Sequence, residues 1–152
     1  MPKFSSVRRV PHRAEDMFAL VADAERYPEF LPLCEALVIR SRRQRDDAVL
    51  LIADMTVGYK AIRETFTSQV LMKPAEHLID VTYLDGPFSR LDNRWRFVPV
   101  NEDSSDVHFF IDYEFRSKVL GTLMGAMFDR AFHQFSQAFA DRADAIYGRR
   151  PV

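Results

Sequence analysis

Residues 107–115, VHFFIDYEF, and residues 118–147, KVLGTLMGAMFDRAFHQFSQAFADRADAIY, decide the fold by a change of hydrophobic period. In the first stretch, apolar side chains fall at every second residue from Val107 to Phe115, which predicts a strand with one buried face. In the second stretch they recur at helical spacing: Leu120, Met124, Met127, Phe128, Ala131, Phe135, Ala138, Phe139 and Ile146. The predicted helix is roughly 45 Å long at 1.5 Å per residue. Ser117 can cap its start and Gly148 its end.

The period-two alternation extends upstream and predicts further strands. They lie within residues 3–10, 37–39, 49–57, 62–70, 79–83 and 91–97. The polar stretch from Arg40 to Asp47 is predicted as a loop between two strands. Apolar residues within 14–21 predict a short helix, and Pro28 and Pro32 leave room for one more helical turn between them.

The order of these elements predicts an α+β fold. Strands that are joined by short turns must pair antiparallel. A sheet and an apolar helix of this length each need a partner to bury one face. We therefore expect a helix-grip arrangement, in which a curved antiparallel sheet wraps around the long C-terminal helix, with two short helices after the first strand. No linker or repeat is visible, so residues 1–152 are predicted to form a single domain.

Composition excludes several classes of protein. Lys and Arg total 21 and Asp and Glu total 22, so the net charge of −1 gives no sign of nucleic-acid binding, and no DNA partner is expected. Cys34 is the single cysteine, which rules out an intrachain disulfide. The N-terminus is too polar for a signal peptide and no apolar run is long enough to span a membrane. We expect a cytoplasmic protein.

Four motifs carry a resemblance to a known family. They are YPEFLPLC at 27–34, GPFSRL at 86–91 followed by WRFVP at 95–99, DYEFRS at 112–117 and MFDRAF at 127–132. In this order they resemble the coenzyme-Q-binding, polyketide-cyclase-like branch of the START-like, Bet v 1-like superfamily, and the resemblance covers nearly the whole chain. Leu33 departs from the pattern, because many relatives carry Trp at that position.

The resemblance implies three alternative functions. The first is non-enzymatic binding of ubiquinone or another polyprenyl lipid, as a carrier or chaperone that supports respiration; such a protein touches a membrane surface transiently and associates peripherally with the inner membrane. The second is that of a ribosome-association toxin, which binds a ribosomal subunit and blocks subunit joining. The third is that of a small cyclase or aromatase enzyme. We favour the lipid carrier, and no cofactor or catalytic residue is expected.

The candidate ligand-binding residues come from the lid motif, from the inward faces of strands and from the start of the last helix. Residues 27–34 either form a lid over a cavity or plug the core. Glu64, Tyr83 and Tyr113 fall on apolar faces, where they either orient a quinone ring or make ordinary hydrogen bonds in the core. The complete set is Tyr27, Phe30, Leu31, Glu64, Phe66, Tyr83, Leu91, Trp95, Tyr113, Met124, Met127 and Phe128. Ala131, Phe135, Ala138 and Phe139 are predicted to pack plainly on the sheet.

Other motifs favour structural roles. Cys34 is interpreted as a buried small apolar residue, because no neighbour in sequence would activate it as a nucleophile. The cluster Arg40, Arg42, Arg43 and Arg45 could contact phosphates of RNA or lipid headgroups, but a solvated turn is favoured. Arg90, Arg94 and Arg96 on one strand face add modest weight to an anionic partner. The four histidines lack the spacing of a metal site.

Overall fold

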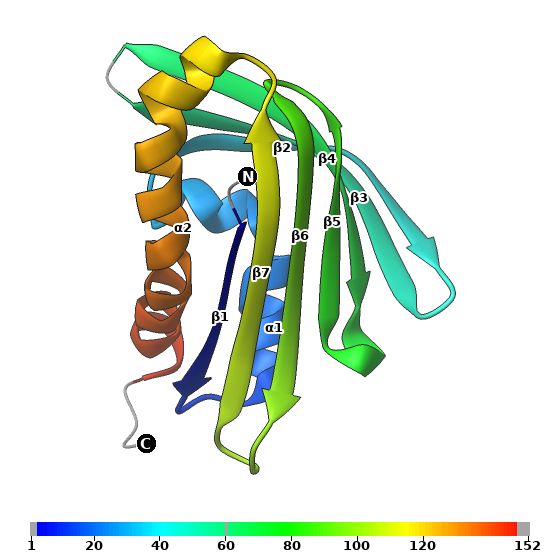
Figure 1. Cartoon of the computed structure of the whole chain (residues 1–152). Helices are drawn as coiled ribbons and strands as arrows, with labels where there is room; N and C mark the ends of the chain where they lie inside the picture. The colour runs from blue at the N-terminus through cyan, green and yellow to red at the C-terminus, as the bar shows by residue number, and fades with distance from the viewer. Residues whose placement is uncertain (1–2, 60, 149–152) are drawn as a thin grey trace.

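The computed structural model describes residues 3–59 and 61–148. The elements follow the predicted order of one strand, two short helical segments, six strands and a long helix (Figure 1). They are β1 (Lys3–Val10), α1 (Ala14–Ala22), the 3₁₀ helix η1 (Ala24–Glu29), β2 (Cys34–Arg45), β3 (Ala48–Tyr59), β4 (Ile62–Lys73), the 3₁₀ turn η2 (Pro74–Glu76), β5 (Leu78–Asp85), β6 (Phe88–Pro99), β7 (Ser105–Phe115) and α2 (Lys118–Tyr147).

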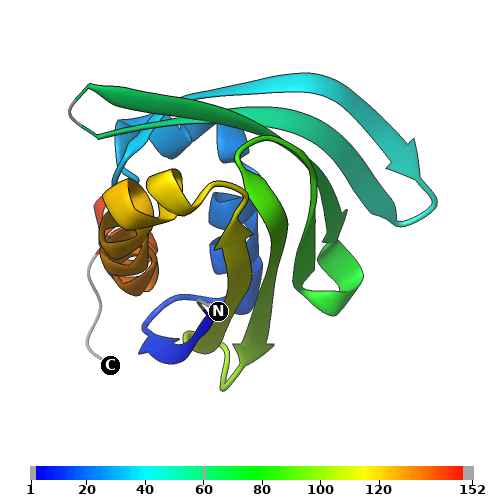
Figure 2. The same cartoon turned by 45° about the horizontal axis from the view of Figure 1, so that its top comes forward.

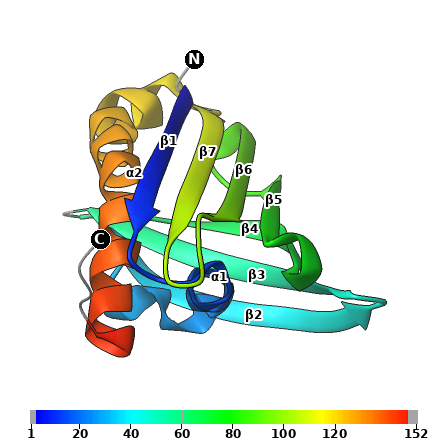
Figure 3. The same cartoon turned by 90° about the horizontal axis from the view of Figure 1, so that it is seen from below.

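All of the strands belong to one antiparallel sheet with the order β1-β7-β6-β5-β4-β3-β2. The sheet is strongly curved: Figure 3 shows β1, β7, β6 and β5 at a steep angle to β4, β3 and β2. The helix α2 lies along the open side of this curve (Figure 2), where α1 contacts α2, β6 and β7, and η1 contacts β2. The predicted α+β helix-grip architecture is therefore confirmed.

The helix α2 has the predicted bounds and the predicted caps. The Ser117 hydroxyl accepts hydrogen bonds from the backbone N–H groups of Val119 and Leu120, which satisfies donors that the first turn cannot pair within the helix. Gly148 follows the last turn with a φ of 89°, a conformation that glycine adopts without steric cost. The buried stripe on its inner face consists of Met124, Phe128, Ala131, Phe132, Ser136, Phe139 and Ala143.

The second of the two short helices is a 3₁₀ helix rather than an α-helix. Pro28 lies inside η1, where it lacks the N–H that an α-helical hydrogen bond requires and restricts the residue before it. By contrast, α1 buries Met17, Leu20 and Val21 on one face, as its spacing predicted. The two segments lead the chain from β1 toward β2 and place residues 27–33 against α2.

The predicted loop from Arg40 to Asp47 is wrong. The strand β2 continues through Arg45, β3 begins at Ala48, and Arg43 pairs with Leu50 in the ladder. Asp46 has a φ of 53°, so the turn needs only residues 46 and 47. The charged sequence is tolerated because β2 lies at the edge of the sheet, where charged side chains reach water and discourage pairing with another chain.

Candidate functional site

A cavity of about 110 Å³ lies between the concave face of the sheet and the middle of α2. Its walls are almost entirely apolar. Because side chains alternate across a strand, the residues of β3 to β7 that line it are spaced two apart, as Leu91, Asn93 and Trp95 of β6 are. Contributions from α2 complete the opposite wall: Phe128, Ala131, Phe132, Phe135 and Phe139.

Only a few polar groups line this cavity. Ser68 is 6% exposed, and its Oγ has no hydrogen-bond partner among the described residues. The Asn93 side chain donates through Nδ2 to the carbonyl oxygen of Phe110 at 2.8 Å. Among the lining residues that the structure describes there is no Asp, Glu, Lys, Arg or His. The cavity is therefore suited to an uncharged guest, because a charge without a partner in an apolar site is costly.

The segment from Tyr27 to Leu33 closes one side of the cavity. The Tyr27 hydroxyl donates a hydrogen bond to the carbonyl oxygen of Val21, and burial raises the pKa of Tyr27 well above its usual range. Leu33 has a φ of 66°, a left-handed conformation that is uncommon for a residue other than glycine. Its carbonyl oxygen accepts from the N–H of Gly58 at 3.0 Å, which ties the segment to β3.

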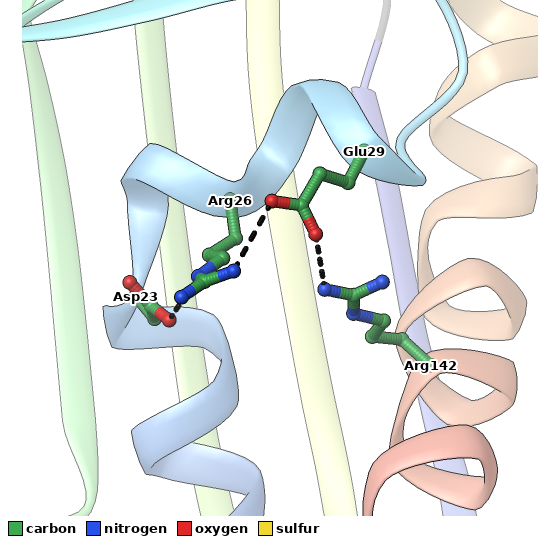
Figure 4. A network of polar contacts seen from close by, with 4 residues as sticks. All are labelled: Asp23, Arg26, Glu29 and Arg142. Atoms are coloured by element: carbon green, nitrogen blue, oxygen red, sulfur yellow. Dashed lines mark hydrogen bonds and ion pairs between the residues drawn. The ribbon is translucent and has the colours of Figure 1, made fainter.

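A group of charged residues attaches η1 to α2 on the outer side of this segment (Figure 4). Arg142 donates through Nη2 to Glu29 Oε1 at 2.6 Å, and its guanidinium carbon lies 5.0 Å from the centre of the Phe30 ring. Arg26 lies 3.4 Å from the Glu29 carboxylate and 3.6 Å from that of Asp23. The hydrogen bond from Arg142 lowers the pKa of Glu29. We call the four charged residues Asp23, Arg26, Glu29 and Arg142 the latch.

Six of the twelve predicted site residues lie at the cavity wall: Tyr27, Leu31, Phe66, Leu91, Trp95 and Phe128. The other six do not line it. The Phe30 ring packs between Arg142 and Phe139, and the Tyr83 hydroxyl accepts a hydrogen bond from the N–H of Phe88 at 3.1 Å. Tyr113 is buried beside the Phe132 ring. The remaining three are Glu64, Met124 and Met127, of which Met124 is fully buried and the other two are partly exposed.

The cavity lies further along α2 than the helix pattern predicted. Met124 and Met127, which were expected at the wall, are outside it. Ala131, Phe135 and Phe139, which were expected only to pack on the sheet, line it. Helical spacing identifies the buried face of a helix, but the curvature of the sheet decides where along that face a gap remains.

Ser68 and Asn93 also line the cavity, although neither was predicted as a site residue from the sequence. A signal for both was present, because each occupies an inward position between apolar residues of its strand. Ser68 stands between Phe66 and Val70, and Asn93 stands two residues after Leu91. A polar residue within such a stripe is either a hydrogen-bonded core residue or a contact for a ligand.

Two of the three arginines in the predicted stripe, Arg90 and Arg94, are paired with carboxylates, whereas Arg96 is exposed and has no ion pair among the described residues. Arg90 lies 2.9 Å from Asp112 and 2.8 Å from Glu114, and Arg94 lies 2.7 Å from Asp80. Because their charges are already compensated, Arg90 and Arg94 give little support to the prediction of an anionic partner. On β2, Arg40 lies 3.4 Å from Asp54, whereas the exposed side chains of Arg42, Arg43 and Arg45 have no ion pair among the described residues.

Neither a reactive thiol nor a metal-type cluster is found in the part of the chain that the structure describes. Cys34 is buried, and this burial raises the pKa of its thiol to about 11, so the thiolate is scarce at neutral pH. No group of three His, Cys, Asp or Glu side chains converges within residues 3–59 and 61–148. Neither helix in those ranges combines the length and the apolar character needed to cross a membrane.

Sequence comparison connects this architecture to known proteins. The profile of the family described as polyketide cyclase / dehydrase and lipid transport matches residues 10–140. The chain is 31% identical over 150 residues to the ribosome association toxin RatA of Escherichia coli K12, a match that covers 99% of this chain and 92% of that protein. It is 28% identical over 154 residues to the mitochondrial coenzyme Q-binding protein COQ10 homolog B of Xenopus laevis, covering 99% and 61% respectively.

Solved structures of other proteins share the fold. The 18 kDa protein CC1736 from Caulobacter crescentus superposes with a TM-score of 0.79 at 32% identity, over 97% of this chain and 99% of that one. A START superfamily protein from Mycobacterium smegmatis superposes with a TM-score of 0.78 at 22% identity, over 95% and 98%. The second likeness is one of fold alone, and it matches the helix-grip arrangement described above.

Proposed function

Because the chain belongs to the polyketide cyclase / dehydrase and lipid transport family, we propose that it binds a hydrophobic ligand without catalysing a reaction. The ligand we favour is ubiquinone or another polyprenyl lipid, which the protein carries or shields in support of respiration. Residues 1–152 act in this proposal as one ligand-binding domain. The name of the coenzyme Q-binding relative supports the choice of ligand.

The observation that carries the proposal is the cavity between the sheet and α2. Sites for small molecules are concave, mostly apolar and equipped with a few polar groups. This cavity has apolar walls, few polar side chains and no charged lining residue among those described. Those features fit a ligand with an uncharged ring and a hydrocarbon tail.

The cavity is too small for a whole polyprenyl lipid unless part of its wall moves. Its volume of about 110 Å³ is below the roughly 300–1,000 Å³ of typical ligand sites. A quinone ring is of this order of size, but an isoprenoid tail is not accommodated without displacement of the wall. The proposal therefore requires either the segment from Tyr27 to Leu33 or the first half of α2, from Lys118 to Arg130, to move outward when a ligand binds.

The first half of α2 also offers a surface for a transient contact with a membrane. Val119 is 67% exposed and Leu123 is 55% exposed, and both lie on this half of the helix. Apolar side chains at such a position insert into the headgroup boundary of a bilayer. Peripheral association of this kind would let a lipid pass between the bilayer and the cavity.

The proposal is tested by analysing the lipids that copurify with the protein. Mass spectrometry of organic extracts should detect a polyprenyl quinone in the wild type. Ala131→Phe places a ring in the cavity and should remove the lipid, because Ala131 is a buried wall residue. Ala126→Phe makes the same change on the exposed face of the same helix and should leave the lipid in place.

Retention of the lipid by a folded Ala131→Phe variant would show that the ligand binds elsewhere. Absence of any hydrophobic ligand from the wild type, together with no uptake of added ubiquinone, would refute the carrier. Circular dichroism and a thermal melt of both variants establish that they are folded before their lipids are compared.

A second candidate, binding to a ribosomal subunit, is supported by the free edge of the sheet. Arg42, Arg43 and Arg45 are exposed on β2 and have no ion pair among the described residues. Clusters of unpaired arginine bind phosphates of RNA through charge and lose affinity as salt displaces them. The relative named as a ribosome association toxin supports this candidate.

Cosedimentation with ribosomal subunits across a salt series tests the second candidate. Replacing these three arginines by Gln should abolish binding under that hypothesis. The control removes three arginines that are already paired with carboxylates, Arg9, Arg90 and Arg94. We expect no specific cosedimentation. Binding that weakens with salt and is lost only in the β2 variant would favour the ribosome.

An enzymatic role finds less support in the cavity. A cyclase or aromatase needs an acid and a base within reach of the reacting atoms. Among the described lining residues, Tyr27 has a side chain that can exchange a proton, and its hydroxyl is engaged by Val21 with a raised pKa. This arrangement favours binding over catalysis.

A further inference from the structure

The Ser68 hydroxyl is a buried polar group without a partner on the wall of an apolar cavity. The side chain is 6% exposed, and Oγ makes no hydrogen bond with any residue that the structure describes. Leaving a buried hydroxyl unpaired costs free energy, and native proteins seldom do so without a reason. The group points to something that occupies the cavity and completes its hydrogen bond.

The cross-strand neighbours of Ser68 do not supply that bond. Across the ladder it pairs with Ala53 of β3 and Tyr83 of β5. Alanine has no polar side chain, and the Tyr83 hydroxyl is engaged with the N–H of Phe88. Along β4 the next inward residues are Phe66 and Val70. The hydroxyl is thus surrounded by groups that leave it unsatisfied.

An ordered water is a poor substitute for a ligand at this position. A buried water needs two to four polar partners to offset its immobilisation. The other polar groups on the sheet side of the cavity, the Asn93 amide and the Trp95 indole N–H, lie on β6, with β5 between them and β4. One amide hydrogen of Asn93 is already donated to the carbonyl oxygen of Phe110. A water held by Ser68 would therefore lack a second strong partner nearby.

The chemistry of the walls limits what the occupant is. Fatty-acid carboxylates and lipid phosphates carry a charge, and no described lining residue provides a counter-charge. A hydroxyl can donate one hydrogen bond and accept others, so it matches a carbonyl or hydroxyl oxygen of a neutral molecule.

We propose that Ser68 donates a hydrogen bond to a single oxygen of a neutral lipid and so fixes the polar end of that ligand against β4. This assignment rests on the proposed lipid-binding function and adds to it the position and the chemistry of the anchoring group. The rest of the ligand contacts apolar walls, and its affinity there depends on shape. Ser68 accordingly selects an oxygenated ligand over a hydrocarbon of the same size.

The test compares two probes on two variants. The probes are ubiquinone with two isoprenoid units and geranylbenzene, which has a ring and the same tail but no oxygen. Quinone binding is read from quenching of Trp95, the single tryptophan of the chain and a residue of the cavity wall, and geranylbenzene is measured by competition. The variants are Ser68→Ala and a matched control, Ser41→Ala, on the exposed edge strand β2.

Loss of one neutral hydrogen bond should weaken quinone binding by Ser68→Ala roughly three- to tenfold. Its affinity for geranylbenzene should be unchanged, and Ser41→Ala should bind both probes like the wild type. The melting temperature of Ser68→Ala should equal or exceed that of the wild type, because an unpaired buried hydroxyl has been removed.

Three outcomes would overturn the assignment. If the wild type binds the quinone and Ser68→Ala binds it equally well, the anchor is wrong while the carrier function stands. If Ser68→Ala loses both probes to the same extent, the serine supports the shape of the cavity rather than an oxygen. If the wild type binds neither probe, the lipid-binding proposal fails and the anchor fails with it.

Discussion

The two halves of α2 are held against the rest of the protein in different ways. The half from Ala131 to Tyr147 is tied to β1, η1 and α1 by polar contacts as well as by packing. These contacts are Ser136 with Ser6 (Oγ to Oγ, 3.2 Å), Arg142 with Glu29 (2.6 Å), Asp144 with His12 (2.8 Å) and the Tyr147 hydroxyl with the carbonyl oxygen of Asp16 (3.3 Å).

The half from Lys118 to Arg130 is held by apolar contacts. Met124 and Phe128 are buried, while the side-chain hydrogen bonds found for this half in the described structure stay within the helix and its Ser117 cap. Val119 and Leu123 of this half are exposed.

The half from Ala131 to Tyr147 is therefore held in a fixed position, whereas the half from Lys118 to Arg130 can move away from the sheet. Polar contacts between elements fix one geometry, whereas apolar packing without them is adaptable and opens at lower free energy. The cavity extends from Phe128 to Phe139 and so crosses the boundary between the two halves. We infer that a ligand larger than the cavity enters by displacing the first half while the second keeps its place.

The largest effect should come from matched truncations in the two halves. Phe139→Ala removes a ring that is 1% exposed and packs on Tyr27, Phe30 and Trp95. It should lower the free energy of unfolding by about 5 kcal/mol, and Phe128→Ala by an amount nearer about 3 kcal/mol, because an unpinned helix half can collapse into the gap. Urea denaturation of both variants measures the difference. An equal loss of unfolding free energy in the two variants would contradict the inference that the first half of α2 is the more mobile one.

Amide hydrogen exchange examines the halves without mutation. Residues 122–130 should exchange at least about tenfold faster than residues 132–146, which corresponds to about 1.4 kcal/mol in opening free energy. Mass spectrometry of peptic peptides or heteronuclear NMR resolves the two segments. Adding ubiquinone should slow exchange in the first segment more than in the second. Uniform protection along α2 would refute the comparison.

A smaller effect is expected where the sheet meets the first half of α2. The Tyr113 hydroxyl is buried without a hydrogen-bond partner among the described residues, and burial raises the pKa of Tyr113 to about 12. Tyr113→Phe should therefore raise the free energy of unfolding by about 1 kcal/mol, as measured by urea denaturation. A comparable loss of stability would mean that this hydroxyl is hydrogen-bonded in solution.

The smallest effect concerns the latch on the second half. Arg142 lowers the pKa of Glu29 below its ordinary value of 4.5, so the ionised carboxylate stabilises the folded state. Glu29→Gln should be slightly less stable than the wild type above pH 4.5, and the difference should vanish as the pH falls through the lowered pKa. Thermal melts across this range provide the measurement.

A neighbouring glutamate supplies the control for the latch. Glu25 is exposed on the same 3₁₀ helix and has no ion pair within the described residues, so Glu25→Gln should show little dependence on pH. If the two variants behave alike, the contact between Glu29 and Arg142 contributes nothing measurable. The half of α2 that carries Arg142 would then rest on packing and its other polar contacts.

Much of the fold could be predicted because the deciding signals are local. The change from period two to helical spacing between Phe115 and Lys118, with Ser117 and Gly148 as caps, predicted both ends of α2. The prediction failed from Arg40 to Asp47, where polar residues form an edge strand. The polar composition of that segment indicates only that it is exposed to solvent. Loops and edge strands are both exposed, so composition does not distinguish between them.

The candidate site was predicted only in part. Alternation identified the inward faces, and Leu91 and Trp95 accordingly lie at the cavity. It could not distinguish an inward residue that lines a gap from one that fills the core, which is why Met124 and Tyr113 were selected and Ser68 was not. Whether the six wall residues bind a ligand stays a prediction.

The sequence by itself determined the order of the elements, the inward faces of the strands and helix, and the membership of a family, because these follow from short-range periodicity and from motifs. Only the tertiary structure decided where the cavity lies, which half of α2 is pinned and which hydroxyl is left without a partner. These properties depend on the curvature of the sheet and on contacts such as Arg142 with Glu29, which join residues 113 positions apart. Packing over that separation is set by the whole chain, and no local window of sequence contains it.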